Sequence, residues 1–103
     1  MKGFNDLVRQ AQVMQKKMAK AQEELKEQTV EAASGGGMVT VVVTGGQEIK
    51  SVKIDPAAVD PEDVSMLEDL VLAAVNEGLK QAKEMIEAEM SSLTGGMSIP
   101  GMF

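Results

Sequence analysis

An unbroken apolar heptad pattern near the amino terminus is the strongest constraint on how this chain can fold. Apolar residues recur at alternating steps of three and four, with neither glycine nor proline among them. The pattern comprises Phe4, Leu7, Ala11, Met14, Met18, Ala21 and Leu25. It predicts a helix of about 33–36 Å at about 1.5 Å per residue, whereas a domain of about 100 residues has a radius of gyration of about 13 Å. We therefore expect this helix to overhang its domain and its apolar seam to need a second helix, from the same chain or from another copy.

The same predicted helix carries positive charge. Every charged residue between Leu7 and Gln22 is basic, namely Arg9, Lys16, Lys17 and Lys20. Residues 1–26 carry six basic and three acidic side chains, whereas the rest of the chain carries four basic and thirteen acidic ones, for a net charge of −6. Such an asymmetry is a hint of an anionic partner for the basic segment, and an ordinary solvated helix face is the alternative interpretation.

Alternating apolar residues and glycine turns predict an antiparallel meander after this helix. The expected strands and turns are residues 28–34, Gly35-Gly36-Gly37, residues 38–44, Gly45-Gly46 and residues 48–54. The Gly45-Gly46 pair fits a tight hairpin that needs positive φ. The middle strand is at least partly apolar on both alternating faces, so we expect it to be central. Asp55-Pro56 should end the sheet, because proline cannot donate a backbone hydrogen bond.

Both helices have recognisable starts. The first should begin near Asn5 or Asp6, either of which can cap it. The second should begin at Asp60–Asp63, where Asp60 can act as the cap, Pro61 suits the first helical position and two acids meet the positive end of the dipole. We expect it to run to about Met90 and residues 91–103 to form a flexible tail.

Together these elements predict an α+β fold of the order α-β(3)-α, with two long helices, in which residues 1–90 form a single two-layer domain. We expect the helices to cover one face of the three-stranded sheet. The first half of the second helix is apolar nearly all round, a surface too wide for one sheet face. A sheet of three strands also leaves a face or an edge unprotected. The sequence therefore predicts a dimer.

Composition argues against an enzyme. The chain has no His, the commonest acid–base and metal-ligating side chain, and no Cys to act as a nucleophile or thiolate ligand. The glycine run lacks the Lys and Ser/Thr of a phosphate-binding loop and precedes a strand instead of a helix. Asp60, Glu62 and Asp63 are better explained as a helix start than as a cation site. No apolar segment is long enough for a signal peptide or a membrane span. We expect a cytoplasmic protein with no metal, cofactor, membrane or small-molecule substrate.

With an enzyme disfavoured, binding of a ligand by an exposed surface remains as the predicted kind of function. Basic residues with no interleaved aromatic suit contact with phosphates better than stacking on bases. Contact of this kind tolerates any base sequence and weakens as salt is added.

Several motifs occur in a characteristic order along the whole chain. They are a Met- and Gln-rich first helix (residues 7–18), the Gly-Gly-Gly turn into a Val-rich strand, Ile49–Pro56, Asp60–Asp63, Met66–Val71, Leu93–Met97 and Pro100-Gly101. In this order they resemble the YbaB/EbfC family of bacterial nucleoid-associated proteins. The resemblance implies a homodimer of α-β(3)-α subunits whose helices project like the arms of tweezers. It also implies binding of double-stranded DNA, with roles at the nucleoid in its organisation and in gene regulation.

The resemblance further implies DNA contacts from the first and the last helix. The candidates are Arg9, Lys16, Lys17, Lys20, Lys80 and Lys83. Lys80 and Lys83 stand four residues before acidic residues, so pairing within the helix explains them equally well. The candidate dimer interface comprises Phe4, Leu7, Ala11, Met14, Met18, Leu67, Leu70 and Val71. A protein-interaction adaptor, using the heptad helix and the acidic last helix, is the alternative function.

Overall fold

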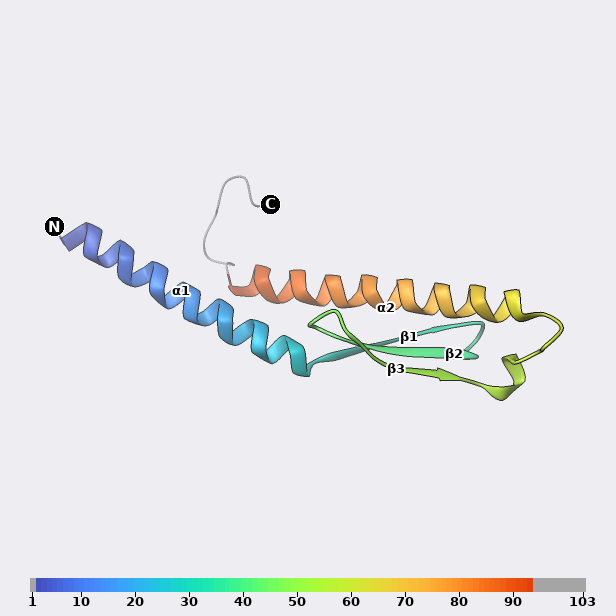
Figure 1. Cartoon of the computed structure of the whole chain (residues 1–103). Helices are drawn as coiled ribbons and strands as arrows, with labels where there is room; N and C mark the ends of the chain where they lie inside the picture. The colour runs from blue at the N-terminus through green and yellow to red at the C-terminus, as the bar shows by residue number, and fades with distance from the viewer. Residues whose placement is uncertain (1, 94–103) are drawn as a thin grey trace.

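The computed structural model describes residues 2–93, which form one elongated α-β(3)-α unit (Figure 1). Its elements are α1 (Lys2–Glu27), β1 (Thr29–Ser34), β2 (Val39–Thr44), β3 (Ile49–Ile54), the short 3-10 helix η1 (Pro56–Ala58) and α2 (Val64–Leu93). The predicted fold class and element order are confirmed. The molecule measures 74 × 24 × 16 Å, with a radius of gyration of 19.7 Å, because α1 extends beyond the sheet as the heptad pattern predicted.

The three strands form an antiparallel meander in the order β1-β2-β3, so the predicted central strand is confirmed. One face of β2 is fully buried, through Val39, Val41 and Val43. The pairing of Val41 with Val52, and of Val39 with Ile54, puts these β3 side chains on the same face. The core of the molecule therefore lies on this one side of the sheet.

α2 covers this face at very close range because its buried positions are small. Ala74, Gly78 and Ala82 are the buried residues of α2, and they recur every four residues along one side of the helix. A methyl group added at Gly78 would lie 2.8 Å from the Val43 Cγ2 and 2.9 Å from the Val41 Cγ2. The two valines thus fill the space that a larger residue at position 78 would need.

The turn between β1 and β2 is fixed by three glycines with positive φ, at 61°, 68° and 98° for Gly35, Gly36 and Gly37. This is the left-handed region that glycine adopts without strain. At the same end of the sheet, the Ser34 Oγ donates a 2.6 Å hydrogen bond to the Leu70 carbonyl oxygen. The first predicted turn is confirmed, and it is tied to α2.

The second hairpin differs from its prediction. Its positive φ, 60°, belongs to Gln47 and not to Gly45 or Gly46. Gly45 is needed instead for a close approach, because a Cβ there would overlap the Leu25 carbonyl oxygen at the end of α1. The Gly45 N–H donates to the Gln28 carbonyl oxygen over 2.9 Å. The hairpin backbone therefore holds the junction between α1 and β1.

The predicted helix boundaries need correction. α1 begins at Lys2, so Asn5 and Asp6 lie inside it and do not cap it. α2 begins at Val64, because Asp60 closes a separate turn by accepting hydrogen bonds from the Glu62 and Asp63 N–H groups. Asp63 is the actual cap, and its Oδ1 accepts from the Met66 N–H over 3.3 Å. α2 ends at Leu93, three residues beyond its predicted end, and residues 94–103 of the predicted tail lie outside the described residues.

The prediction that both helices cover the sheet is wrong in one respect. α2 forms the covering layer, over β1 and β2, whereas among residues 3–93 α1 makes few contacts with α2 and β2, and its buried residues, Ala21 and Leu25, lie near its carboxyl end. One helix is about 10 Å wide and neighbouring strands lie about 4.8 Å apart, so a single helix covers about two strands. Every residue of β3 is consequently exposed.

Candidate nucleic-acid interface

The candidate DNA-binding residues of α1 lie on an arm that leaves the body of the molecule (Figure 1). We call residues 3–20 of α1 the arm, and α2 with the three strands the body. Within the described part of α1, only Ala21 and Leu25 are buried, at 3% and 2% exposure. The helix is therefore anchored by its last two turns, and the arm is accessible to a ligand.

Four cations follow one another along this arm. Arg9, Lys16, Lys17 and Lys20 are all exposed. From the first to the last the helix rises about 16 Å, at 1.5 Å per residue, which corresponds to about five phosphates of one DNA strand at 3.4 Å each. Among residues 3–93 the structure records one ion pair, Lys26 with Glu23 at 3.7 Å, so none of the four cations is neutralised by direct contact with a carboxylate.

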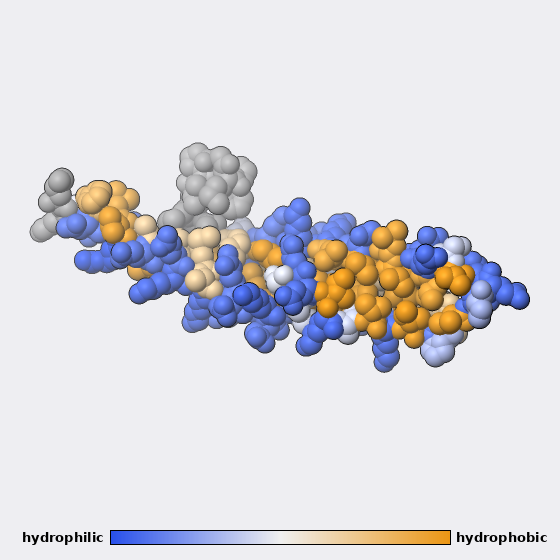
Figure 2. All heavy atoms as spheres, viewed as in Figure 1, coloured by the Kyte–Doolittle hydropathy of each residue, from blue (hydrophilic) through white to orange (hydrophobic). Residues whose placement is uncertain are grey.

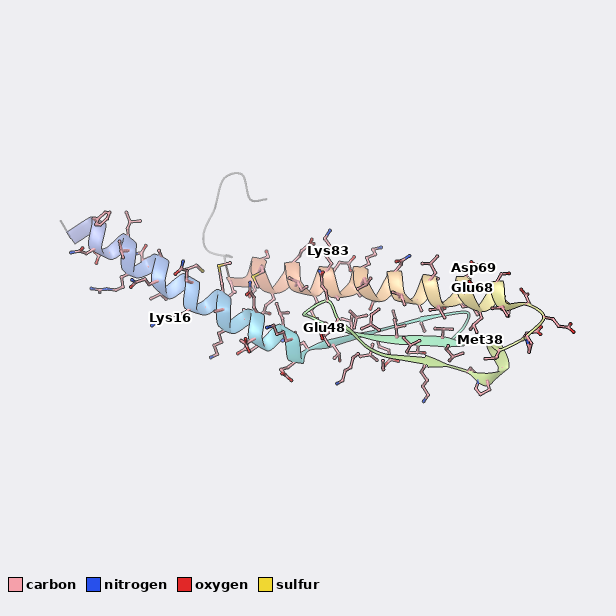
Figure 3. The ribbon with its side chains drawn as sticks, viewed as in Figure 1. Lys16, Met38, Glu48, Glu68, Asp69 and Lys83 are labelled. Atoms are coloured by element: carbon pink, nitrogen blue, oxygen red, sulfur yellow. The ribbon has the colours of Figure 1, made fainter. Side chains whose placement is uncertain are left out.

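Lys80 and Lys83 lie elsewhere, on the exposed surface of α2. In Figure 3, Lys83 points away from the sheet on the outer side of α2, while Lys16 extends from α1 toward the opposite edge of the view. Neither α2 lysine belongs to an ion pair in the described part of the chain, although Glu84 and Glu87 are at helical spacing from them. A single chain thus does not bring the two candidate sets together.

At the base of the arm, two of its cations face acidic groups. Lys17 and Lys20 line a groove of about 400 Å³ together with Glu24 of α1 and Glu89 of α2. Glu89 is half-buried, whereas the two lysines and Glu24 are exposed. Arg9 and Lys16 are not part of this groove. The basic row therefore has an outer part that lies outside this groove and a base that shares the groove with two carboxylates.

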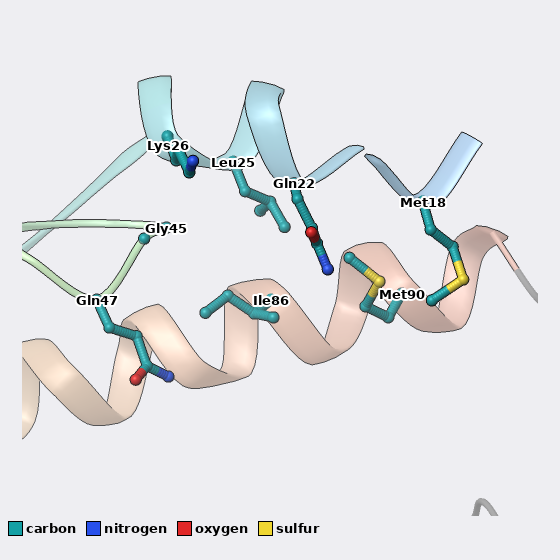
Figure 4. A pocket seen from close by; sticks show the side chains of 9 residues that line it. Met18, Gln22, Leu25, Lys26, Gly45, Gln47, Ile86 and Met90 are labelled. Atoms are coloured by element: carbon teal, nitrogen blue, oxygen red, sulfur yellow. The ribbon is translucent and has the colours of Figure 1, made fainter. Parts of the chain in front are cut away.

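A second hollow, of about 500 Å³, lies where α1 meets the end of α2 (Figure 4). Met18 of α1 points toward Met90 of α2, and Leu25 points toward Ile86. The remaining lining comes from Gln22, Lys26 and residues 45–47 of the second hairpin. Flexible methionines at such a junction adapt to irregular packing. The contact between α1 and α2 is thus narrow and flanked by open space.

The candidate dimer residues occupy two distinct regions. Phe4 and Leu7, at 63% and 66% exposure, lie on the arm, together with exposed Ala11 and half-buried Met14 and Met18. Leu67, Leu70 and Val71 lie half-buried along α2, packed against the core. Leu70 faces the glycine turn of β1–β2, where its Cδ2 would lie 2.8 Å from a Cβ at Gly35.

Sequence reasoning missed a further apolar surface, on β3. Ile49, Val52 and Ile54 share the face that α2 covers on the other strands, yet each remains more than one third exposed. Beside them runs a groove of about 450 Å³, lined by Ile54, Leu67, Glu68, Val71, Leu72 and Val75. Figure 2 shows apolar side chains gathered over the half of the body where α2 begins. The alternation of β3 was the signal that could have found this surface.

The match to known proteins covers nearly all of the sequence. Residues 1–97 match the YbaB/EbfC DNA-binding family. The chain belongs to this family. A nucleoid-associated protein of Acetivibrio thermocellus is 61% identical over 101 residues, covering 97% of this chain and 89% of the relative. One of Thermoanaerobacter sp. is 56% identical over 100 residues, with 97% and 90% covered.

The fold of this YbaB/EbfC chain also occurs in a crystal structure. The uncharacterized protein HP0035 of Helicobacter pylori superposes with a TM-score of 0.79 at 27% identity, covering 89% of this chain and 97% of that one. The YbaB/EbfC family is a DNA-binding family and not an enzyme family. Among the described residues there is no cluster of three or more acidic side chains placed to hold a metal ion, and no helix apolar and long enough to cross a membrane.

Proposed function

We propose that this chain is a nucleoid-associated protein that binds double-stranded DNA mainly through phosphate contacts. One observation carries the proposal: four exposed cations line an arm that projects from an otherwise acidic molecule. Exposed Lys and Arg on a helix can approach a phosphate backbone without any rearrangement of the body. Membership of a DNA-binding family and relatives named as nucleoid-associated proteins support the same ligand.

The charge distribution defines the mode of binding. The body is acidic, so it disfavours the approach of DNA and favours contact through the arm. No aromatic side chain stands among Arg9, Lys16, Lys17 and Lys20, so bases have no stacking platform there. We expect binding with little sequence preference, steep dependence on salt and weak affinity at physiological ionic strength. Lys80 and Lys83 form a second, lesser candidate contact on α2.

We further propose that the protein acts as a homodimer joined through β3 and the adjacent flank of α2. One α2 covers two strands, and the third strand presents Ile49, Val52 and Ile54 without a cover. The α2 of a second copy has an apolar flank, including Leu67 and Val71, that is suited to cover them. The same patch then serves both subunits, as a two-fold interface requires. Two α2 helices would lie side by side between two sheets and leave both arms free.

Two arms on one particle give the dimer an architectural role. Each arm adds its own phosphate contacts, so the dimer binds DNA with higher affinity than a single arm does. We infer a place in the bacterial cytoplasm at the nucleoid, with effects on nucleoid organisation and gene regulation. No cofactor takes part in this proposal.

The experiment is fluorescence anisotropy of a labelled duplex of about 30 base pairs, long enough for the several phosphates that each arm contacts, beside a scrambled duplex at several salt concentrations. The proposal predicts similar affinity for both duplexes and a log–log salt slope of about −0.9 per phosphate engaged. Absence of binding by the folded dimer even at low salt would contradict it.

One observation favours the second candidate, a protein-interaction adaptor. Phe4 and Leu7 are exposed at the end of the arm, where α2 of the same chain does not reach them. An apolar stripe of this kind suits a partner helix. A folded dimer that ignores DNA would favour this role over DNA binding.

A further inference from the structure

The groove at the base of the arm contains charges of both signs, and they come from different helices. Lys17 and Lys20 belong to α1, whereas Glu89 belongs to α2, and all three line the groove of about 400 Å³. Charges that line one groove interact through the solvent at low ionic strength, where the Debye length is about 30 Å at 0.01 M. Glu89 therefore lowers the electrostatic potential that a phosphate meets at these two lysines.

The groove is not closed by direct pairing. Within residues 3–93 neither lysine forms an ion pair with Glu89 or Glu24, and both are exposed. Glu24 stands four residues after Lys20 on the same helix and contributes to the same acidic side. Glu89 is distinct because it belongs to α2 and is half-buried there, whereas Glu24 is exposed and lies on the same helix as the two lysines.

We propose that Glu89 sets how much of the arm DNA can engage, by competing with phosphate for Lys17 and Lys20. This inference rests on the proposed DNA binding and adds a residue on the other helix that limits the affinity. In the parent protein, DNA contacts mainly the arm cations that lie outside this groove, Arg9 and Lys16. The two base lysines contribute fully only when the Glu89 charge is removed.

The test is Glu89→Gln, which removes the charge and keeps the shape of the side chain. The matched control is Glu62→Gln, which changes the net charge equally at an exposed position before α2. Some 25 residues of α2 separate Glu89 from the start of the helix, about 38 Å at 1.5 Å per residue. Duplex affinity is measured by anisotropy at several salt concentrations, together with the salt at which each variant leaves a heparin column.

We expect Glu89→Gln to bind the duplex about 2- to 4-fold more tightly at low salt, since a carboxylate no longer opposes the lysines. Its log–log salt slope should steepen by up to about 0.9 for each lysine that engages an additional phosphate. Glu62→Gln should bind like the parent protein. In a Lys17→Ala/Lys20→Ala background, Glu89→Gln should have no effect, because its partners are gone.

Equal gains in affinity from Glu89→Gln and Glu62→Gln would overturn the inference, since net charge alone would then explain them. A gain that persists without Lys17 and Lys20 would overturn it as well. Failure of the parent protein to bind any duplex would instead contradict the proposed function. The heparin column distinguishes failure of this inference from failure of the proposed function, because a sulfated polyanion can bind the lysines even if duplex DNA is not the ligand. Elution of Glu89→Gln at higher salt than both the parent and Glu62→Gln supports the competition.

Discussion

The body and the arm of this molecule differ in how closely their side chains are packed. In the body, α2 lies against β2 so closely that Ala74, Gly78 and Ala82 are its buried residues, and the facing valines of β2 are fully buried. On the arm, by contrast, apolar Phe4 and Leu7 are mostly exposed, and the buried residues that anchor the helix, Ala21 and Leu25, lie beyond the arm near its carboxyl end. Folding stability therefore resides in the body, while the charge that meets a ligand resides on the arm.

This difference teaches that one continuous heptad seam can have two roles. Its last positions pack against the body, and its first positions extend past it. Mutations in the two regions should therefore affect different properties of the protein. Changes in the body should alter unfolding, and changes on the arm should alter binding alone.

The largest effect should come from filling the close approach between α2 and the sheet. Gly78→Leu introduces a side chain where even a Cβ would lie 2.8 Å from Val43. We expect it to destabilise the protein by about 3 kcal/mol or more, at the upper end for overpacked cores, as measured by urea unfolding. The control is Ala73→Leu on the exposed side of the same helix, which should change stability by less than about 0.5 kcal/mol. Similar stability of the two variants would contradict the close packing of α2 against the sheet.

A second test compares the two ends of the heptad seam with one chemical change. Leu25→Ala removes a side chain that is 2% exposed and should cost about 2–3 kcal/mol. Leu7→Ala removes one that is 66% exposed and should cost under about 0.5 kcal/mol. Both are measured by thermal and urea unfolding. Equal destabilisation would mean that the arm is packed in solution, against its own body or a second copy.

The third test concerns the uncovered strand. Val52→Asp places a charge on the apolar face of β3, whereas Ser51→Asp places the same charge on its opposite face. We expect the first to weaken dimerisation at least about tenfold, because an unpaired carboxylate would be buried at the interface, and the second to have little effect. Analytical ultracentrifugation measures both. A dimer unaffected by Val52→Asp would move the interface to another surface.

Much of the fold could be predicted from local patterns. The heptad seam, the Gly35–Gly37 turn and the Val-rich central strand each specify their structure within a few residues. Boundaries were less accurate where two residues could serve the same purpose. Asp60 and Asp63 both precede α2, and only the hydrogen bonds show that Asp63 caps it.

Tertiary relations were beyond the sequence pattern. Alternation on β3 indicates an apolar face but not that one helix is too narrow to cover three strands. The small residues of α2 at every fourth position were a readable sign of close packing that the apolar pattern obscured. For the candidate site, the row of arm cations could be predicted from the sequence. The position of Glu89 across a groove from Lys17 and Lys20 could not, because it depends on how α1 meets α2.

The most direct test of the account is duplex binding by Lys16→Ala/Lys17→Ala/Lys20→Ala, measured by anisotropy at low salt beside its urea unfolding. All three lysines are exposed on the arm and unpaired among residues 3–93, so the free energy of unfolding should change by less than about 0.5 kcal/mol per substitution. Affinity should fall about 10- to 100-fold, and the log–log salt slope should flatten by about 0.9 for each phosphate that the variant no longer neutralises. Unchanged affinity and slope in the folded variant would show that the arm is not where this protein meets DNA.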